Sequence, residues 1–288
     1  MLNPITYIKE YILLQSCSNY NSDATRKAAR TKKRARATFA QEGVPHAAGA
    51  VFLNPLSALR FVQQYGFPVV VKPNYGGFSR GSFFPITSYA QLFRALVLVK
   101  CYWPTTVIEQ YLSGKNYRVV IGRGKILAVT RRYPPFVIGD GKRTVAELIA
   151  QENAVREQMG LYPTMSPIDP KRSLVPLTTL PKKGARVSLG RKIALEPGGC
   201  IENLPGTMPA KNRKLFEQLL RAFNANILGI DVIMSKGIEY AYDTQACIFL
   251  EANARPYVKM HRYPRYGKPV DIDRKMQEKK KKRIIARS

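Results

Sequence analysis

The sequence has 288 residues, of which 45% are hydrophobic and 23% are charged, so the chain can bury a substantial core and is not disordered throughout. Its 47 Lys and Arg against 19 Asp and Glu give a formal net charge of +28, which favours contact with phosphates, nucleic acids or acidic surfaces. Four scattered cysteines without a CxxC pair argue against a zinc site and a disulfide framework, which fits a reducing cytoplasm. No apolar stretch reaches the roughly 20 residues that span a bilayer, so we expect a soluble, cytoplasmic protein.

Residues 1–50 are predicted to form a short helical N-terminal segment. TRKAARTKKRARATFAQEGVPH, which starts at Thr25, is typical of a basic helix that ends at Gly43 and Pro45. A second basic run falls in 273–288, which we expect to be a solvated C-terminal tail. These runs indicate either a generally basic surface or a nucleic-acid site, although they lack interleaved aromatic residues and any recognisable binding module.

A strand and a glycine-rich loop are predicted next. FPVVVK, residues 67–72, is a β-branched run of the kind found in buried strands. NYGGFSRGS, residues 74–82, follows it as a loop. ITSYAQLFRALVLV then predicts a helix in which Ser88 and Gln91 have the spacing of a capping box.

The rest of the chain predicts an α+β fold with antiparallel strand pairs. YRVVIGRGKILAVTRR is typical of a hairpin that turns at Gly122 and Gly124. Residues 152–190 lack a clear pattern and are assigned to loops and short strands. The remaining expected elements are the strand TTVIEQYL, a helix capped by Thr144 and Glu147, a helix over 210–225, and the strands ILGIDVIM and CIFLEAN.

Lys72 is a candidate phosphate ligand because it closes a buried strand just before the glycine-rich loop. An ammonium there can reach a phosphate while loop amides approach its oxygens. Taken alone, the same residues are more typical of a solvated strand end and an ordinary turn. The loop is not a Walker A motif, since it lacks GK[ST] at the required spacing.

Three oxygen-bearing side chains near the end of the chain are candidate metal ligands. Glu251 and Asn253, two residues apart in a strand, point to one face. Asp231 lies in an apolar strand, where a charge is costly unless it is paired or bound to metal. Each alone could be a cap or a salt-bridge partner, whereas together with Lys72 they favour magnesium, a hard cation that takes oxygen ligands.

The order of these motifs resembles the ATP-grasp ligases, and most of all the ATP-grasp part of the cyanophycin synthetases. Members of that group read like VEEFIPGRDYRV, PPHVVGDG, AGID and EVNAAPG followed by RMH. This chain has IEQYLSGKNYRV, PPFVIGDG, EPGGCIENL, LGID and EANARPYVKMH, and the likeness covers roughly residues 25–272. It implies an ATP-grasp domain over 51–272, whose smaller lobe (about 60–115) and larger lobe (about 116–272) clamp ATP between antiparallel sheets.

The resemblance implies roles for named residues. It implies ATP and two Mg²⁺ ions as cofactors, with Mn²⁺ able to substitute. Arg118 and Arg255 would hold phosphate or an acyl-phosphate, with ordinary surface arginines as the alternative, and His261 would assist substrate binding or be structural. The implied nucleotide ligands are Lys72, Gly76, Gly77, Ser79 and Gly81 at the triphosphate, Glu109, Gln110, Tyr111 and Leu112 at the adenine, and Asn116 at the ribose, while the implied metal ligands are Asp231, Glu251 and Asn253.

Two positions depart from the family pattern. Lys115 and Asn116 stand where relatives carry GRD or GRE, whose acid binds the ribose hydroxyls, and NARPY replaces NAAPG, which adds Arg255. Cyanophycin synthetases also continue beyond the equivalent of Asp271 into a Mur-ligase-like domain with a second ATP site, so we expect this chain not to be a complete one.

The resemblance implies an ATP-dependent carboxylate–amine ligase that forms an acyl-phosphate and releases ADP and phosphate. Its partners would be ATP and amino-acid or peptide substrates, with no membrane, and a homo-oligomer is compatible with the sequence. Two alternatives stay open: a degenerate ATP-grasp protein that binds nucleotide without turnover, and, ranked lower, a basic nucleic-acid-binding protein.

Overall fold

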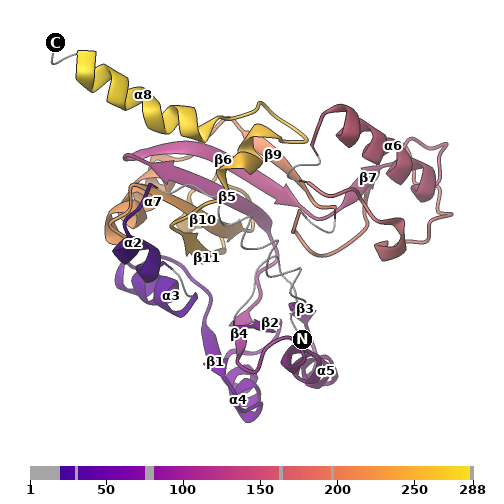
Figure 1. Ribbon diagram of the computed structural model, residues 1–288. Coiled ribbons are helices and arrows are strands. Elements are labelled where there is room, and N and C mark those ends of the chain that lie inside the picture. The colour runs from indigo at the N-terminus through magenta and orange to yellow at the C-terminus, as the bar shows by residue number, and fades with distance from the viewer. Residues whose placement is uncertain (1–19, 30–31, 75–80, 162–164, 196–197, 286–288) are drawn as a thin grey trace. The chain divides into compact units, whose positions relative to one another are not determined.

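The computed structural model describes residues 20–29, 32–74, 81–161, 165–195 and 198–285 (Figure 1). The chain divides into two compact units and passes between them repeatedly. The first unit comprises Met1–Lys115, Ile121–Lys125 and Met208–Pro256. The second comprises Asn116–Val120, Ile126–Thr207 and Tyr257–Ser288.

Helices and strands alternate irregularly along the chain, as in α+β proteins. The α-helices are α2 (Asp23–Ala28), α3 (Lys32–Gln41), α4 (Leu56–Tyr65), α5 (Tyr89–Lys100), α6 (Val145–Gln158), α7 (Ala210–Ala222) and α8 (Ile272–Ile285). Short 3-10 helices are η1 (Pro170–Arg172), η2 (Tyr242–Thr244) and η3 (Val258–Arg262). The strands are β1 (Gly49–Phe52), β2 (Val69–Pro73), β3 (Phe83–Ile86), β4 (Thr106–Gln110), β5 (Lys115–Gly122), β6 (Lys125–Tyr133), β7 (Phe136–Ile138), β8 (Arg186–Ser188), β9 (Cys200–Leu204), β10 (Ile227–Met234) and β11 (Cys247–Asn253).

The first unit contains an antiparallel sheet of four strands in the order β1-β4-β2-β3. Helices α4 and α5 lie beside this sheet in Figure 1 and pack on one of its faces, where Val69, Val71 and Ile108 are buried. Side chains alternate along a strand, so Lys72 and Glu109 point to the opposite face. The apolar side of the sheet thus builds the core and leaves the other side for polar groups.

The first unit also contains the antiparallel pair β10–β11. Phe39 of α3 and Phe216 of α7 both contact Phe249 of β11, with ring centroids 5.9 and 5.5 Å away. Edge-to-face and tilted contacts of this kind add to the stabilisation from burying the rings. The helices therefore cover one face of the strand pair.

In the second unit, strands β5, β6 and β9 are neighbours in that order, and β7 pairs with β8. Arg123 and Gly124 connect β5 to β6, with φ angles of 51° and 70°. Two positive φ angles are what a type I′ hairpin turn requires, and such a turn suits the twist of the strands. Helix α6 packs through Val145, Leu148 and Ile149 against β7 and the loops around it.

Several sequence predictions are confirmed. β10 and β11 match ILGIDVIM and CIFLEAN, and α7 buries the predicted apolar face. Thr144 and Glu147 form the reciprocal capping box at the start of α6. Ser88 caps α5, but Gln91 reaches back to the amide of Thr87 rather than to Ser88, so only half of the predicted box forms.

Other expectations need correction. The single basic helix is two helices, α2 and α3, because α2 ends at Ala28. Helix α6 continues to Gln158, into the segment expected to be irregular, and the segment expected to be a solvated tail forms α8, with Met276 buried. The sequence patterns also missed the helix and strands α4, β3 and β9. None of the helices in the described residues is long and apolar enough to cross a membrane.

Candidate functional site

Asp231 and Glu251 occupy directly opposed positions in the β10–β11 pair. The register shifts just beyond them, since Val232 pairs with Phe249, so Leu250 is an extra residue that forms a β-bulge. A bulge re-aims side chains. It allows Phe249 to face the helices while Glu251, only two residues later, faces the same side as Asp231.

The side-chain oxygen atoms at this position suit a hard cation. Asn253 Nδ2 donates to Glu251 Oε1 at 2.8 Å, which leaves the amide oxygen of Asn253 as a further acceptor. Asp231 is buried, with only 5% of its surface exposed. Two carboxylates and an amide oxygen are ligands that Mg²⁺ accepts, with water and phosphate completing its shell. Among the described residues, no three His, Cys, Asp or Glu side chains gather into a metal-binding cluster, here or elsewhere.

Lys72 lies in a buried ion-pair cluster with Glu109 and Arg36. Lys72 Nζ donates to Glu109 Oε2, and Arg36 Nη1 donates to Glu109 Oε1 at 2.6 Å. The side chains of Lys72, Arg36 and Glu109 are 15%, 11% and 5% exposed, so both cations share one desolvated carboxylate. Arg36 therefore points inward, although the basic segment around it was expected to be solvated or to bind nucleic acid.

Gly49 makes room for this cluster. It pairs with Glu109 across β1 and β4. A Cβ atom at Gly49 would lie 2.5 Å from Arg36 Nη1 and 2.9 Å from Glu109 Cγ. A larger residue at position 49 would therefore displace the guanidinium or the carboxylate.

The residues predicted to contact adenine continue from this cluster. Gln110 ends β4 and accepts from the amide of Ala48 at 3.2 Å, and the amide of Tyr111 donates to Pro68 O at 3.0 Å. The ring of Tyr111 stacks on Phe84. Leu112 is half-buried directly after them.

The predicted glycine loop is described only at its end. Gly81 has a φ of 65°, and a Cβ atom there would lie 2.7 Å from the ring of Tyr102. Gly76, Gly77 and Ser79 lie outside the described residues. Arg255 is half-buried just after β11, in the first unit with Lys72 and the metal-ligand candidates.

Asn116 and Arg118 belong to the second unit, on β5, and both are buried. Arg132 Nε on β6 donates to Asn116 Oδ1 at 2.7 Å. Because that oxygen is engaged by a cation, Asn116 presents its amide nitrogen as the remaining donor. This polarity is opposite to that of the acid that the resemblance implies at this position.

His261 is fully buried, and Nδ1 lies 2.7 Å from Thr130 Oγ1. Burial lowers the pKa of His261 to about 3, and the positive charges of Arg118, Arg132 and Lys275 act in the same direction. The ring is therefore neutral at physiological pH. It belongs to the buried polar network of Thr130 and Asn203 in the second unit.

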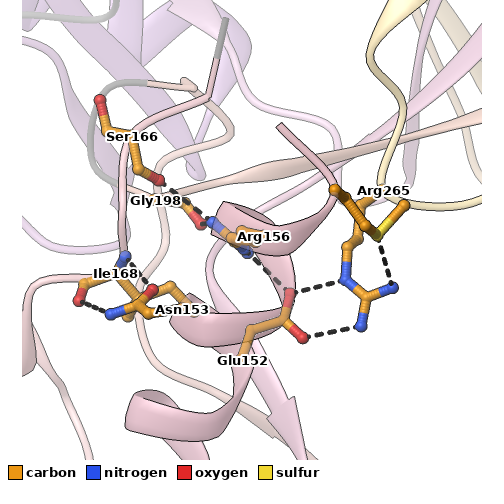
Figure 2. A network of polar contacts seen from close by, with 8 residues as sticks. Glu152, Asn153, Arg156, Ser166, Ile168, Gly198 and Arg265 are labelled. Atoms are coloured by element: carbon orange, nitrogen blue, oxygen red, sulfur yellow. Dashed lines mark hydrogen bonds and ion pairs between the residues drawn. The ribbon is translucent and has the colours of Figure 1, made fainter. Parts of the chain in front are cut away.

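A second polar network fixes α6 in the same unit (Figure 2). Arg156, with no exposed surface, donates to Glu152 and to the carbonyl oxygens of Ser166 and Gly198 at 3.2 and 2.9 Å. Arg265 donates two hydrogen bonds of 2.9 Å to the carboxylate of Glu152. Burial alone would raise the pKa of Glu152, but the hydrogen bonds from Arg265 and Arg156 hold it below the ordinary range.

Sequence reasoning missed Arg36, Arg132 and the Glu152 network. Arg36 is one of several basic residues in its segment, and no local pattern marks the one that turns inward. The position of Arg132 could have been found from the sequence. It lies two residues after Thr130 on β6, the strand next to β5, so Arg132 and Thr130 point to the same face of the sheet.

Comparison with known proteins shows likeness to several synthetases and ligases in sequence and in fold. No protein-family model matches the sequence. Cyanophycin synthetase of Nostoc sp. is 28% identical over 253 residues, which cover 84% of this chain and 28% of that protein. A bifunctional glutathione synthetase from Pasteurella multocida superposes with a TM-score of 0.63 at 20% identity, covering 91% of this chain and 37% of the other. The ATP-grasp ligase PsnB, complexed with a minimal precursor, superposes with a TM-score of 0.53 at 14% identity over 90% of this chain and 61% of its own.

The chain has the ATP-grasp fold. Its α+β class and antiparallel sheets agree with the expectation from the motifs. The chain spans less than a third of the length of the cyanophycin synthetase that it matches. The match therefore covers most of this chain and only part of that relative.

Proposed function

We propose that this chain is an ATP-dependent carboxylate–amine ligase that releases ADP and phosphate. The observation that carries the proposal is the direct pairing of Asp231 with Glu251, with Asn253 bonded to Glu251, in a chain of ATP-grasp fold. Two carboxylates held on one face suit a metal-bound triphosphate. Its sequence likeness to a synthetase supports the same reaction class.

Each cluster of the first unit has a role in this proposal. Asp231, Glu251 and Asn253 would hold magnesium, which would neutralise phosphate charge. Lys72 supplies an ammonium for a phosphate oxygen, while Glu109 and Arg36 fix the position of that ammonium. Gln110, Tyr111 and Leu112 border the adenine, and the amide of Gly81 is a ligand for the triphosphate.

The reaction proceeds in two displacements. An oxygen of the substrate carboxylate attacks the γ-phosphorus of ATP, the bond from that phosphorus to the β–γ bridging oxygen breaks, and ADP leaves. A neutral amine then attacks the acyl carbon, the bond to the phosphate oxygen breaks, and the nitrogen loses one proton. The products are an amide, ADP and phosphate.

The substrates in this proposal are amino acids or peptides. Arg118 and Arg255 supply guanidinium groups for the transferred phosphoryl group or the acyl-phosphate. A cytoplasmic site of action is part of the proposal, since it fits the need for ATP and the free thiols of Cys101, Cys200 and Cys247.

The test is a screen of amino acids and short peptides for magnesium-dependent phosphate release, with Glu251→Ala as the inactive control. We expect ADP, rather than AMP, to appear in proportion to the amide formed. Release of AMP and pyrophosphate would contradict the proposal, and so would activity that survives in Glu251→Ala.

A second candidate function, nucleotide binding without turnover, is favoured by one observation. Arg132 engages the oxygen of Asn116, at the position where relatives carry the ribose-binding acid. Tight ATP binding by calorimetry, with no ADP released across the whole substrate panel, would favour this candidate over the ligase.

A further inference from the structure

The ion-pair cluster of Arg36, Lys72 and Glu109 carries more positive than negative charge. Lys72 Nζ bonds to one oxygen of the Glu109 carboxylate, and Arg36 Nη1 bonds to the other oxygen at 2.6 Å. Two cations and one anion sum to one positive charge, whereas Lys72 and Glu109 without Arg36 would sum to zero. Arg36 is therefore the residue that makes these three side chains attractive to an anion.

The position of Arg36 is fixed by the helix that carries it. Ala35 and Phe39, which flank Arg36 in α3, are fully buried. The ring of Phe39 contacts the ring of Phe249 on β11, with centroids 5.9 Å apart. The Arg36 side chain is itself only 11% exposed. A charge that packing already holds in place needs little reorganisation to act on a ligand.

Space for the guanidinium comes from a glycine on β1. Gly49 does not have a positive φ angle, so its backbone conformation does not require glycine. A Cβ atom at Gly49 would lie 2.5 Å from Arg36 Nη1, which is closer than Cβ atoms approach other heavy atoms. The missing side chain at position 49 thus makes room for Arg36 to reach Glu109.

A phosphate group that approaches Lys72 also approaches Glu109. The carboxylate repels the phosphate, because both are anions, and among side chains this deeply buried the repulsion offsets much of the attraction to the ammonium. Arg36 bonds to the carboxylate oxygen that Lys72 does not use. It can therefore cancel the charge of Glu109 while Lys72 keeps its place.

We propose that Arg36 is a positioning residue for the nucleotide phosphates: by cancelling the charge of Glu109, it lets the ammonium of Lys72 bind them. The inference rests on the proposed function, which puts a phosphate group at Lys72. Arg36 acts through Glu109 and does not touch the nucleotide. Loss of Arg36 should therefore weaken binding of the phosphates and leave binding of the nucleoside unchanged.

The test compares ADP with adenosine, which lacks the phosphates. Each compound displaces a fluorescent ADP analogue from the full protein in the presence of Mg²⁺, in the wild type and in Arg36→Met. We expect Arg36→Met to weaken ADP binding about tenfold and adenosine binding less than about twofold. Arg34→Met is the matched control, because Arg34 is exposed on the same helix and its loss changes the net charge equally. It should leave both affinities unchanged.

Two further variants separate the charge of Arg36 from a structural role. Arg36→Lys keeps the charge and should restore most of the ADP affinity. Arg36→Met combined with Glu109→Gln removes one charge of each sign and leaves the charge of Lys72. The ratio of the ADP and adenosine affinities, which removes any change in adenine binding, should then return toward the wild-type ratio. A structural role predicts that the double variant binds ADP less well than Arg36→Met does.

Three results overturn the proposal: a wild type that binds ADP no more tightly than adenosine, an affinity ratio that Arg36→Met leaves unchanged, and a double variant whose ratio stays at the Arg36→Met value. An equal effect of Arg34→Met also overturns it. The expected ratios in a protein without turnover would support the role of Arg36 while the ligase function fails. Turnover with an unchanged ratio would have the opposite meaning.

Discussion

Asp231 and Glu251 face each other across β10 and β11, although Glu251 would lie on the other face without the bulge at Leu250. We expect Asp231→Asn and Glu251→Gln each to lower ATP-dependent phosphate release by about 100-fold or more, because each removes a charge that would hold magnesium. A magnesium titration of the rate should require higher concentrations in both variants. Asp243→Asn, the same change in an exposed pair with Lys211, is the control and should leave the rate unchanged.

The part of this site that follows strand periodicity could be predicted from the sequence. Apolar runs mark β10 and β11, and a spacing of two places Glu251 and Asn253 on one face. The pairing of Asp231 with Glu251 could not be predicted, because it depends on an extra residue, Leu250, that no glycine or other local signal marks.

Polar pairs between residues far apart in the sequence could not be predicted either. Arg36 and Glu109 are 73 positions apart, and nothing in a basic helix distinguishes the arginine that meets a buried carboxylate. The fold itself could be predicted, because its motifs occur in a fixed order. Side chains that satisfy one another across the fold need the three-dimensional arrangement.

Glu109 balances two buried cations, so its loss should be costly. We expect Glu109→Gln to lower the free energy of unfolding by about 3 kcal/mol or more, because it removes the negative charge that the buried side chains of Lys72 and Arg36 share. Urea denaturation followed by circular dichroism measures the change. Asp23→Asn breaks the exposed pair with Arg26 and should have little effect, and a similar loss in both variants would contradict the argument.

Gly49 should be intolerant of a side chain for a reason that a double-mutant cycle can isolate. We expect Gly49→Ala to destabilise the protein, because the new Cβ atom meets Arg36 Nη1 and Glu109 Cγ. If the effect acts through Arg36, Gly49→Ala should cost much less free energy of unfolding in the Arg36→Met background than in the wild type. The two changes should then be clearly non-additive. Additive unfolding free energies would assign the effect of Gly49→Ala to the backbone of β1 instead.

Arg156 should stabilise the second unit through backbone carbonyls. We expect Arg156→Met to cost about 2 to 4 kcal/mol, because the carbonyl oxygens of Ser166 and Gly198 lose a buried donor (Figure 2). Hydrogen exchange should rise in α6 and near β9 and stay unchanged in the sheet β1-β4-β2-β3. Arg172→Met, which removes an exposed arginine of the same unit, is the matched control, and faster exchange spread over the whole chain would contradict a local role.

The buried neutral ring of His261 should make stability depend on pH. The unfolded chain protonates this histidine near its ordinary pKa of about 6.5, while the folded chain does so only at about 3, so the unfolded state binds more protons between these values. The free energy of unfolding should therefore fall as the pH falls below about 6.5, by up to about 1.4 kcal/mol per pH unit from this group. His261→Asn should lose that part of the slope in urea denaturation at pH 7, 6 and 5, whereas His46→Asn should keep it. Parallel slopes in the wild type and His261→Asn would mean that the ring takes up a proton equally well in the folded and unfolded states.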